Sequence, residues 1–148
     1  MSKMPYLIYL ISHYLYKLKI PIIPKLFVFI NRILWGAYIP ASCSIGKGTK
    51  FGYGGSGVVI HARAVIGKNC LISPCVTIGG RSRIFDVPVI GDNVFMGGGA
   101  KVLGNVKIGN NVVIGANAVV ICCVPDNCIV AGVPAKIIKR NIRVEDYV

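Results

Sequence analysis

Two histidines are the side chains of this sequence best suited to move a proton near neutral pH, and they stand in different settings. His61 directly follows Ile60, at a place where other copies of a six-residue repeat often carry glycine. An imidazole placed as a general base typically contributes about 10²–10⁴-fold to a reaction rate. Histidine also tolerates the left-handed backbone of tight corners, so a structural role for His61 stays open. His13 lies in an apolar segment, where packing or an interface is the expected role.

A catalytic histidine usually needs a partner that orients its ring. Asp86 and Asp92 are the carboxylates that the sequence offers for this purpose. We take Asp86 as the candidate catalytic partner of His61. Asp92 follows a glycine corner and is better explained as a solvated corner residue.

The six cysteines indicate neither a metal site nor a disulfide framework. Their spacing matches no zinc site, and the adjacent Cys122 and Cys123 are badly placed to bridge each other. Cys43 and Cys70 fall at small positions of the repeat, where a cysteine behaves as a small buried hydrophobe. We therefore expect no metal, and reduced thiols in a cytoplasmic setting.

These residues are positioned by a repeat that is clearest between 90 and 120. An aliphatic residue or methionine returns there at every sixth position. Six is a multiple of the strand period of two but not of the helical 3.6, so the repeated side chains share one face. The pattern predicts a parallel β-helix of short strands. The repeated residues are Ile90, Met96, Val102, Ile108, Ile114 and Val120.

Small residues and corner residues complete each six-residue unit. Two positions before the aliphatic the side chain is small or β-branched, as a narrow stacked interior requires. Glycine often follows the aliphatic and asparagine often stands third after it, and both enter left-handed backbone at low cost. Each unit should therefore be a short strand and a tight corner. The small positions are Val94, Ala100, Val106, Val112 and Ala118; the corners are Gly91, Gly97, Gly109, Gly115, Asn93, Asn105, Asn111 and Asn117.

The sixfold count fails in two places, and interruptions of a solenoid often carry function. Between Phe51 and Ile60 the spacing is nine instead of six, which predicts a small bulge over 53–57. The segment 79–89 allows two interpretations. Ile84 keeps the count, so the segment could form two ordinary units. Its paired glycines, two arginines and proline instead favour an extruded loop.

The N-terminal part is a different kind of sequence. Two apolar, aromatic-rich segments, 6–18 and 25–38, flank Pro21 and Pro24, which interrupt any helix. The pattern predicts a helical hairpin that carries lysine and arginine but no acid. Neither arm has the ~18–20 uninterrupted apolar residues of a spanning helix. The hairpin could lie in a membrane interface, or pack on the β-helix or on a neighbouring subunit.

The chain thus divides into three parts. We expect the helical hairpin over 1–38, the β-helix over 39–133 and a basic C-terminal tail over 134–148. Hydrophobic residues make up 54% of the chain and charged residues 15%, which suits a solenoid with an aliphatic residue in every unit.

The charge balance points to an anionic partner. Seventeen lysines and arginines against five acids give a net charge of +12. Nucleic acid, a membrane surface and a phosphate-rich cofactor are the candidates. The basic residues scatter along the repeat instead of clustering with aromatic residues on a recognisable module, so we expect no nucleic acid partner.

Four motifs, in order, resemble the serine acetyltransferase branch of the hexapeptide-repeat acyltransferases. The resemblance covers roughly residues 39 to 139, and it implies an all-β solenoid, a left-handed parallel β-helix. It also implies a homotrimer that uses acetyl-CoA, with active sites in grooves between neighbouring β-helices. The motifs are Gly57-Val58-Val59-Ile60, Val76-Thr77-Ile78-Gly79-Gly80, Gly98-Gly99-Ala100-Lys101-Val102-Leu103-Gly104-Asn105 and Ala131-Gly132-Val133-Pro134-Ala135-Lys136.

The resemblance further implies which residues hold acetyl-CoA. In this family the cofactor lies along the coil edges toward the C-terminal end. Gly79 and Gly80 could give backbone N–H groups to the oxyanion at the thioester. Lys136 could bind a phosphate or be a solvated surface lysine. By position, the remaining cofactor residues are Gly98, Ala100, Gly115, Ala116, Ala131, Gly132 and Pro134.

The sequence departs from this family at both catalytic histidines. Serine acetyltransferases carry one in a His-Ala-Thr-Gly stretch, where this chain has Gly54-Gly55-Ser56-Gly57. They carry the second in an Asp-Arg-His-Pro loop, where this chain has Phe85-Asp86-Val87-Pro88. Relatives in surface-polysaccharide pathways resemble this chain in having Val-Ile-His at the position of His61.

These observations lead to one functional hypothesis and two alternatives. The hypothesis is an acetyl-CoA-dependent O-acetyltransferase that acts on a sugar hydroxyl of a surface polysaccharide or its precursor, with His61 as the general base. The first alternative acceptor is L-serine. The second alternative is a non-catalytic trimeric scaffold. We expect a cytoplasmic protein, and the hairpin leaves open a contact with the inner face of the membrane.

Overall fold

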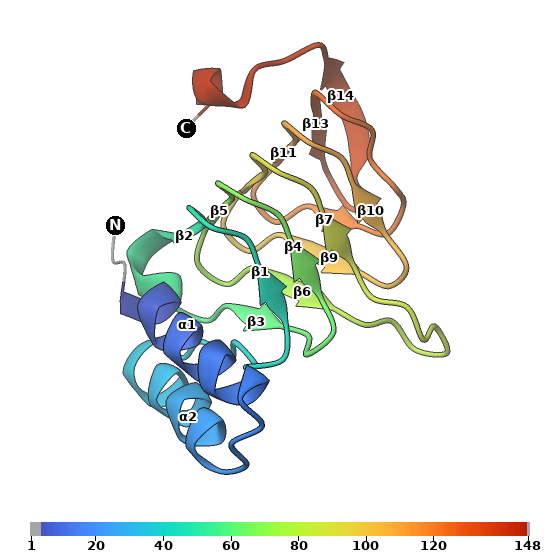
Figure 1. The fold of residues 1–148 in the computed structure, drawn as a ribbon. Coiled ribbons are helices and arrows are strands. Elements are labelled where there is room, and N and C mark those ends of the chain that lie inside the picture. The colour runs from blue at the N-terminus through green and yellow to red at the C-terminus, as the bar shows by residue number, and fades with distance from the viewer. Residues whose placement is uncertain (1–3, 148) are drawn as a thin grey trace.

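The computed structural model describes residues 4–147, which form a three-sided prism of short strands with two helices across one end (Figure 1). Each side of the prism is one sheet. The first sheet contains β1 (Ser44–Ile45), β4 (Val65–Ile66), β7 (Val89–Ile90) and β10 (Lys107–Ile108). The second contains β2 (Lys50–Phe51), β5 (Leu71–Ile72), β8 (Phe95–Met96), β11 (Val113–Ile114), β13 (Cys128–Ala131) and β14 (Lys136–Arg140). The third contains β3 (Val59–Ile60), β6 (Thr77–Gly79), β9 (Lys101–Leu103) and β12 (Val119–Val120).

The strands stack in parallel with the repeated aliphatic residues in register. Ile60 pairs with Ile78 on the third sheet, and Ile72 pairs with Met96 on the second. Because side chains alternate along a strand, the first residue of most of these strands faces outward and the second faces the interior. The six repeated residues between 90 and 120 are at most 3% exposed. The predicted β-helix and its core are therefore confirmed.

The corner glycines serve a purpose other than the predicted one. Gly91 and Gly97 do not have a positive φ, whereas Asn93 and Asn111 have φ of 54°. A Cβ on Gly97 would lie 2.6 Å from the backbone nitrogen of Ala116 in the next coil. Glycine is needed there because successive coils stack too closely for any side chain. The prediction of left-handed backbone at these glycines was wrong, and the prediction at these asparagines is confirmed.

The helical hairpin packs its inner face on the first coil. It consists of α1 (Met4–Lys17) and α2 (Ile23–Trp35), and α2 ends at Gly36 with φ of 65°. The buried hydroxyl of Tyr9 donates to the carbonyl oxygen of Cys43 at 2.8 Å. His13 bonds through Nδ1 to the carbonyl oxygen of Ala41 at 2.7 Å, so this imidazole ties α1 to the first coil. Burial raises the pKa of the Cys43 thiol to about 12.

The segment 79–89 is an extruded loop. Strand β6 ends at Gly79 and β7 begins at Val89, and both flanking strands keep their places in the stack. Ile84 is 38% exposed, so it does not enter the core. The loop leaves the prism between β6 and β7 (Figure 1). Of the two interpretations of this segment, the extruded loop is the one that the structure shows.

The C-terminal end closes with a hairpin in place of another parallel coil. β14 runs antiparallel to β13, with Ala131 opposite Lys136. The boundary predicted at 133/134 thus falls inside this hairpin, and part of the predicted tail belongs to the second sheet. A short 3₁₀ helix follows at Val144–Tyr147. Within residues 4–147, no helix has the length and apolar character needed to cross a membrane.

Candidate active site

The prism has three edges, and the chemistry-bearing residues divide between two of them. The glycine edge lies where the second sheet meets the third; it includes residues 97–100 and 115–118, and the turn between β13 and β14 places residues 131–134 beside them. The histidine edge joins the third sheet to the first and consists of residues 61–64 and 79–88. The third edge, at 67–70, 91–94 and 109–112, joins the first sheet to the second.

The glycine edge brings together most of the residues predicted to hold the cofactor. The backbone N–H of Asn117 donates to the carbonyl oxygen of Gly98 at 2.9 Å, which locks neighbouring coils together. Ala116 is exposed, so this edge presents backbone and a methyl group to the outside. Ala100 is fully buried, so only its backbone could face a ligand. The predicted cofactor residues on this edge are Gly98, Ala100, Gly115, Ala116, Ala131, Gly132 and Pro134.

The C-terminal hairpin extends the glycine edge. The backbone N–H of Val119 donates to Gly132 at 3.0 Å, and that of Ala135 donates to Val119 at 2.8 Å. These two bonds hold the turn against the last coil. Lys136 begins β14 directly after the turn and its side chain is exposed. Its charge is thus available beside the edge.

His61 stands at the start of the first turn on the histidine edge. Its backbone N–H donates to Ile78 at 2.8 Å, and its ring nitrogen Nδ1 accepts a hydrogen bond from the N–H of Arg63 at 3.1 Å. A backbone N–H only donates, so Nδ1 must be unprotonated and the neutral ring carries its proton on Nε2. His61 is not among the residues with positive φ. A left-handed backbone is therefore not the structural reason for a histidine at this position. The structural reason is the hydrogen bond by which the His61 ring caps its own turn.

Gly79 and Gly80 lie beside His61 and not on the glycine edge. A Cβ on Gly80 would be 3.9 Å from Cδ2 of the His61 ring, so the ring lies over this glycine. The backbone of Gly79 accepts a hydrogen bond from Gly104 at 3.0 Å. The two glycines grouped with the cofactor residues by sequence thus sit next to the proposed base.

Arg63 fastens the extruded loop to the histidine edge, a role that the sequence analysis missed. Its guanidinium lies 3.8 Å from the centre of the Phe85 ring. Its Nη2 donates to the carbonyl oxygen of Phe85 at 2.6 Å. Residues 63 and 85 follow strands that are neighbours on the third sheet, so coil counting could have placed them together. The stacking itself had no signal in the sequence.

The two candidate carboxylates occupy different edges. Asp86 is exposed in the loop, next to the clamped Phe85, and the ring of His61 takes its hydrogen bond from Arg63 instead. Asp92 lies on the third edge, where its Oδ1 accepts from the backbone N–H of Lys68 at 2.7 Å. Asp92 is thus a structural corner residue. Within residues 4–147, no group of three His, Cys, Asp or Glu side chains is arranged to hold a metal ion.

The predicted bulge has no room for the histidine that the resemblance would place there. It forms a short 3₁₀ segment at Gly52–Gly55, in which Tyr53 is 87% exposed. Gly54 has φ of 71°, and a Cβ on it would lie 2.8 Å from Nε1 of Trp35 and closer still to Cδ1. Trp35 ends α2, so the hairpin fills the space above this position.

Comparison with known proteins relates the chain to the hexapeptide-repeat transferases. Residues 88–122 match the model described as bacterial transferase hexapeptide (six repeats). A serine acetyltransferase of Synechococcus elongatus is 41% identical over 138 residues, which is 91% of this chain and 56% of that protein. The chain shares the hexapeptide repeat and the left-handed β-helix with these transferases. In such a β-helix, the extruded loop and the two edges are the features that a site can use.

Two solved structures show the same fold. The serine acetyltransferase of Brucella abortus strain S19 in complex with coenzyme A aligns with a TM-score of 0.87 at 31% identity, covering 91% of this chain and 54% of that one. The soybean serine acetyltransferase complexed with serine aligns with a TM-score of 0.85 at 32% identity, covering 90% and 56%. The chain spans little more than half the length of each of these relatives.

Proposed function

We propose that this chain is an acetyl-CoA-dependent O-acetyltransferase. The observation that carries the proposal is the alignment of seven predicted cofactor residues along one edge of a β-helix whose fold matches a coenzyme A complex. The edge offers backbone groups and small side chains, and Lys136 stands at its end. An extended, phosphate-bearing cofactor suits such an edge because it needs close backbone approach and a nearby cation.

The reaction needs a base and a place for developing negative charge. A hydroxyl oxygen attacks the thioester carbonyl, the C–O bond forms and the C–S bond breaks. The hydroxyl proton passes to the base, and the coenzyme leaves as a thiol once its sulfur is protonated. We assign the base to His61, with backbone N–H groups at Gly79 and Gly80 beside it to stabilise the oxyanion. Asp86, on the loop over the same edge, is the proposed orienting carboxylate.

The geometry of His61 adds a condition to this assignment. In the free chain the lone pair of its ring lies on Nδ1 and is engaged by the Arg63 N–H. To take a proton, the ring must release this bond when acceptor and cofactor are in place. Catalytic hydrogen bonds commonly form only in the reactive complex, so the free geometry is compatible with this role.

A trimer would complete the site. The histidine and glycine edges bound the same sheet, β3-β6-β9-β12, from opposite sides, so one chain does not bring them face to face. Packing β-helices side by side around a threefold axis would put the histidine edge of one chain against the glycine edge of the next. We therefore propose a homotrimer with composite sites.

The comparisons favour serine as the acceptor over the saccharide predicted from the sequence. The relatives and solved structures reported above are named serine acetyltransferases. A sugar hydroxyl is the second candidate, and the packing of Gly54 against Trp35 supports it. That contact leaves no space for the histidine that the resemblance assigns to serine enzymes.

Release of free coenzyme A thiol from acetyl-CoA separates these possibilities. We expect the full-length chain to release thiol only when a hydroxyl acceptor is present. Rapid turnover with L-serine would assign serine as the acceptor, and turnover with a saccharide alone would assign the sugar. An absence of both acetyl-CoA binding and turnover would overturn the enzyme proposal in favour of the scaffold.

A further inference from the structure

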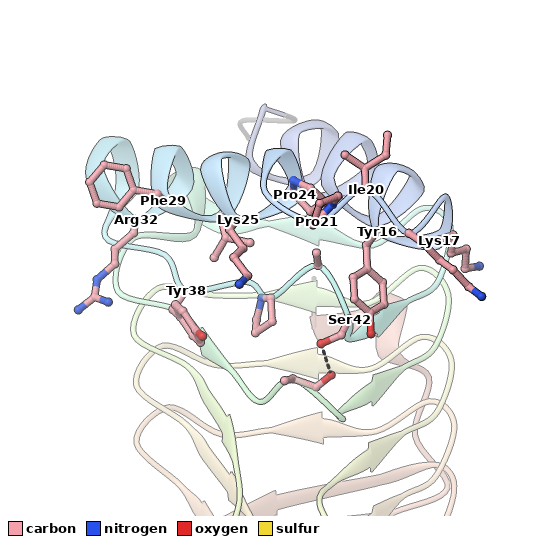
Figure 2. Close-up of a pocket in the computed structure, with 15 residues that line it drawn as sticks. Tyr16, Lys17, Ile20, Pro21, Pro24, Lys25, Phe29, Arg32, Tyr38 and Ser42 are labelled. Carbon is pink, nitrogen blue, oxygen red and sulfur yellow. Dashed lines mark hydrogen bonds between the residues drawn. The ribbon is translucent and has the colours of Figure 1, made fainter.

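A groove of about 860 Å³ lies between the helical hairpin and the first coil, away from the glycine edge. Figure 2 shows α1 and α2 above it, with Tyr16 pointing down toward Ser42 and Lys25 directed toward the coil. Ser42 is bonded to the carbonyl oxygen of Ala62 at 2.9 Å, and both line the groove. Ala62 follows His61, so the groove opens beside the histidine edge.

The rim of this groove is strongly basic and has no acid to balance it. Lys17, Lys19, Lys25 and Arg32 line it, and all four side chains are exposed. The first acid in the sequence is Asp86, so the whole hairpin is free of carboxylates. Within residues 4–147, no salt bridge involves any of these four cations. The groove therefore presents unneutralised positive charge over apolar walls.

The outer face of the hairpin is apolar and uncovered. Tyr9 and His13 tie α1 to the first coil, and other apolar side chains of both helices remain exposed. Their exposed fractions lie between 40% and 65%. Neither helix is long enough to cross a bilayer. The residues of this apolar face are Leu7, Leu10, Ile11, Tyr14, Ile23, Leu26, Phe29, Ile33 and Leu34, and Phe29 also lines the groove.

We propose that the hairpin docks on an anionic lipid bilayer, with the apolar face in the lipid interface and a lipid phosphate in the basic groove. An amphipathic element with lysines, arginines and aromatic residues has the composition of an interfacial helix pair. A second copy of this chain fits less well, because it would place four cations against the same four cations. Like charges in an interface are unfavourable, whereas an anionic surface complements them.

Vesicle co-sedimentation of the full-length chain tests this proposal. We expect binding to equimolar phosphatidylcholine–phosphatidylglycerol vesicles, weak binding to pure phosphatidylcholine, and loss of binding as salt is raised. The triple variant Lys17→Gln, Lys19→Gln and Lys25→Gln should bind about a hundredfold more weakly, since each cation near a membrane surface contributes about fivefold. A matched control neutralises three exposed coil lysines by Lys47→Gln, Lys50→Gln and Lys68→Gln, and should stay within about threefold of wild type.

Other outcomes would overturn the docking proposal. Equal loss in the two triple variants would mean that net charge, and not the groove, drives binding. An absence of binding to the anionic vesicles would contradict it directly. A further contradicting result concerns the assembly without lipid. If the variant with Leu10→Ser and Leu26→Ser forms a smaller assembly than wild type, a second copy of the chain covers the apolar face in the wild type. Acetyl transfer to a soluble acceptor should be unchanged in the lysine variant, so failure here leaves the proposed enzyme activity intact.

Discussion

The glycine edge and the histidine edge are built from the same repeat but differ in what the sequence could reveal about them. Along the glycine edge small residues recur, and at Gly97 the next coil lies too close for a side chain. Along the histidine edge the repeat is broken by an imidazole at position 61 and by the loop 79–88. The regular stretches of the repeat thus supply a surface for a ligand, whereas its interruptions supply reactive groups.

The largest effect should come from replacing His61, and two variants separate its two roles. His61→Asn keeps an oxygen that can accept the Arg63 N–H, as in an Asx turn, but cannot act as a base. If His61 is the base, both His61→Asn and His61→Ala should lower kcat by about 10²–10⁴-fold. If His61 only caps the turn, His61→Asn should keep near wild-type turnover. His13→Ala removes the other imidazole and should leave kcat unchanged in the folded protein.

A smaller effect, on stability, is expected from replacing a closely stacked glycine of the glycine edge. Gly97→Ala would force a methyl group to within 2.6 Å of the Ala116 nitrogen, and should cost about 1–3 kcal/mol of unfolding free energy. Gly98→Ala is the matched control, because its nearest atom would be 3.8 Å away, and it should change stability by less than about 0.5 kcal/mol. Denaturant unfolding measures both, and equal effects would contradict close stacking as the reason for Gly97.

Cofactor binding to the same edge predicts a third effect. Ala116→Glu adds a negative charge to an exposed position of the glycine edge and should raise KM for acetyl-CoA roughly tenfold with kcat nearly unchanged. Ser44→Glu adds the same charge to an exposed position of the first sheet and should have little effect on KM. Steady-state kinetics measures both variants, and an equal KM for acetyl-CoA in the two would contradict the cofactor assignment.

The smallest effect should come from releasing the loop at the histidine edge. Arg63→Ala removes the stacking on Phe85 but keeps the backbone N–H that bonds to His61. A cation–π contact at an exposed site contributes about 0.5–1 kcal/mol, so acceptor KM should rise by about two- to fivefold. Trypsin cleavage after Arg81 and Arg83 should be faster in the variant. An unchanged cleavage rate would show that Arg63 does not hold the loop.

The fold could be predicted well from the sequence because the same six-residue pattern recurs in every coil. A period of six is visible at each aliphatic residue, and burial of those residues follows from strand alternation. The corner glycines show the limit of that reasoning. The pattern predicted their positions, but the reason for glycine there is the short distance between successive coils. A one-dimensional pattern does not contain the spacing between coils.

The site was predictable only in part. Most of the residues assigned to acetyl-CoA from the resemblance lie on one edge because equivalent positions of each coil must stack, whereas Gly79 and Gly80 lie beside His61. Coil counting relates positions 63 and 85, but the stacking of Arg63 on Phe85 has no signal in the sequence. The Trp35 side chain over Gly54 and the basic groove each join segments that the repeat does not relate. Such contacts depend on where a loop or a helix folds back, and no local pattern specifies that.

The most direct test of the composite site mixes two impaired variants. His61→Ala disables the histidine edge, and Ala116→Glu weakens the glycine edge. The assay uses acetyl-CoA at a concentration below the raised KM of the Ala116→Glu variant. If each site joins the histidine edge of one chain to the glycine edge of the next, refolding equal amounts together should restore roughly a quarter of wild-type activity, because one interface in four then pairs two intact edges. Activity that stays at the sum of the separate variants would contradict a site shared between chains.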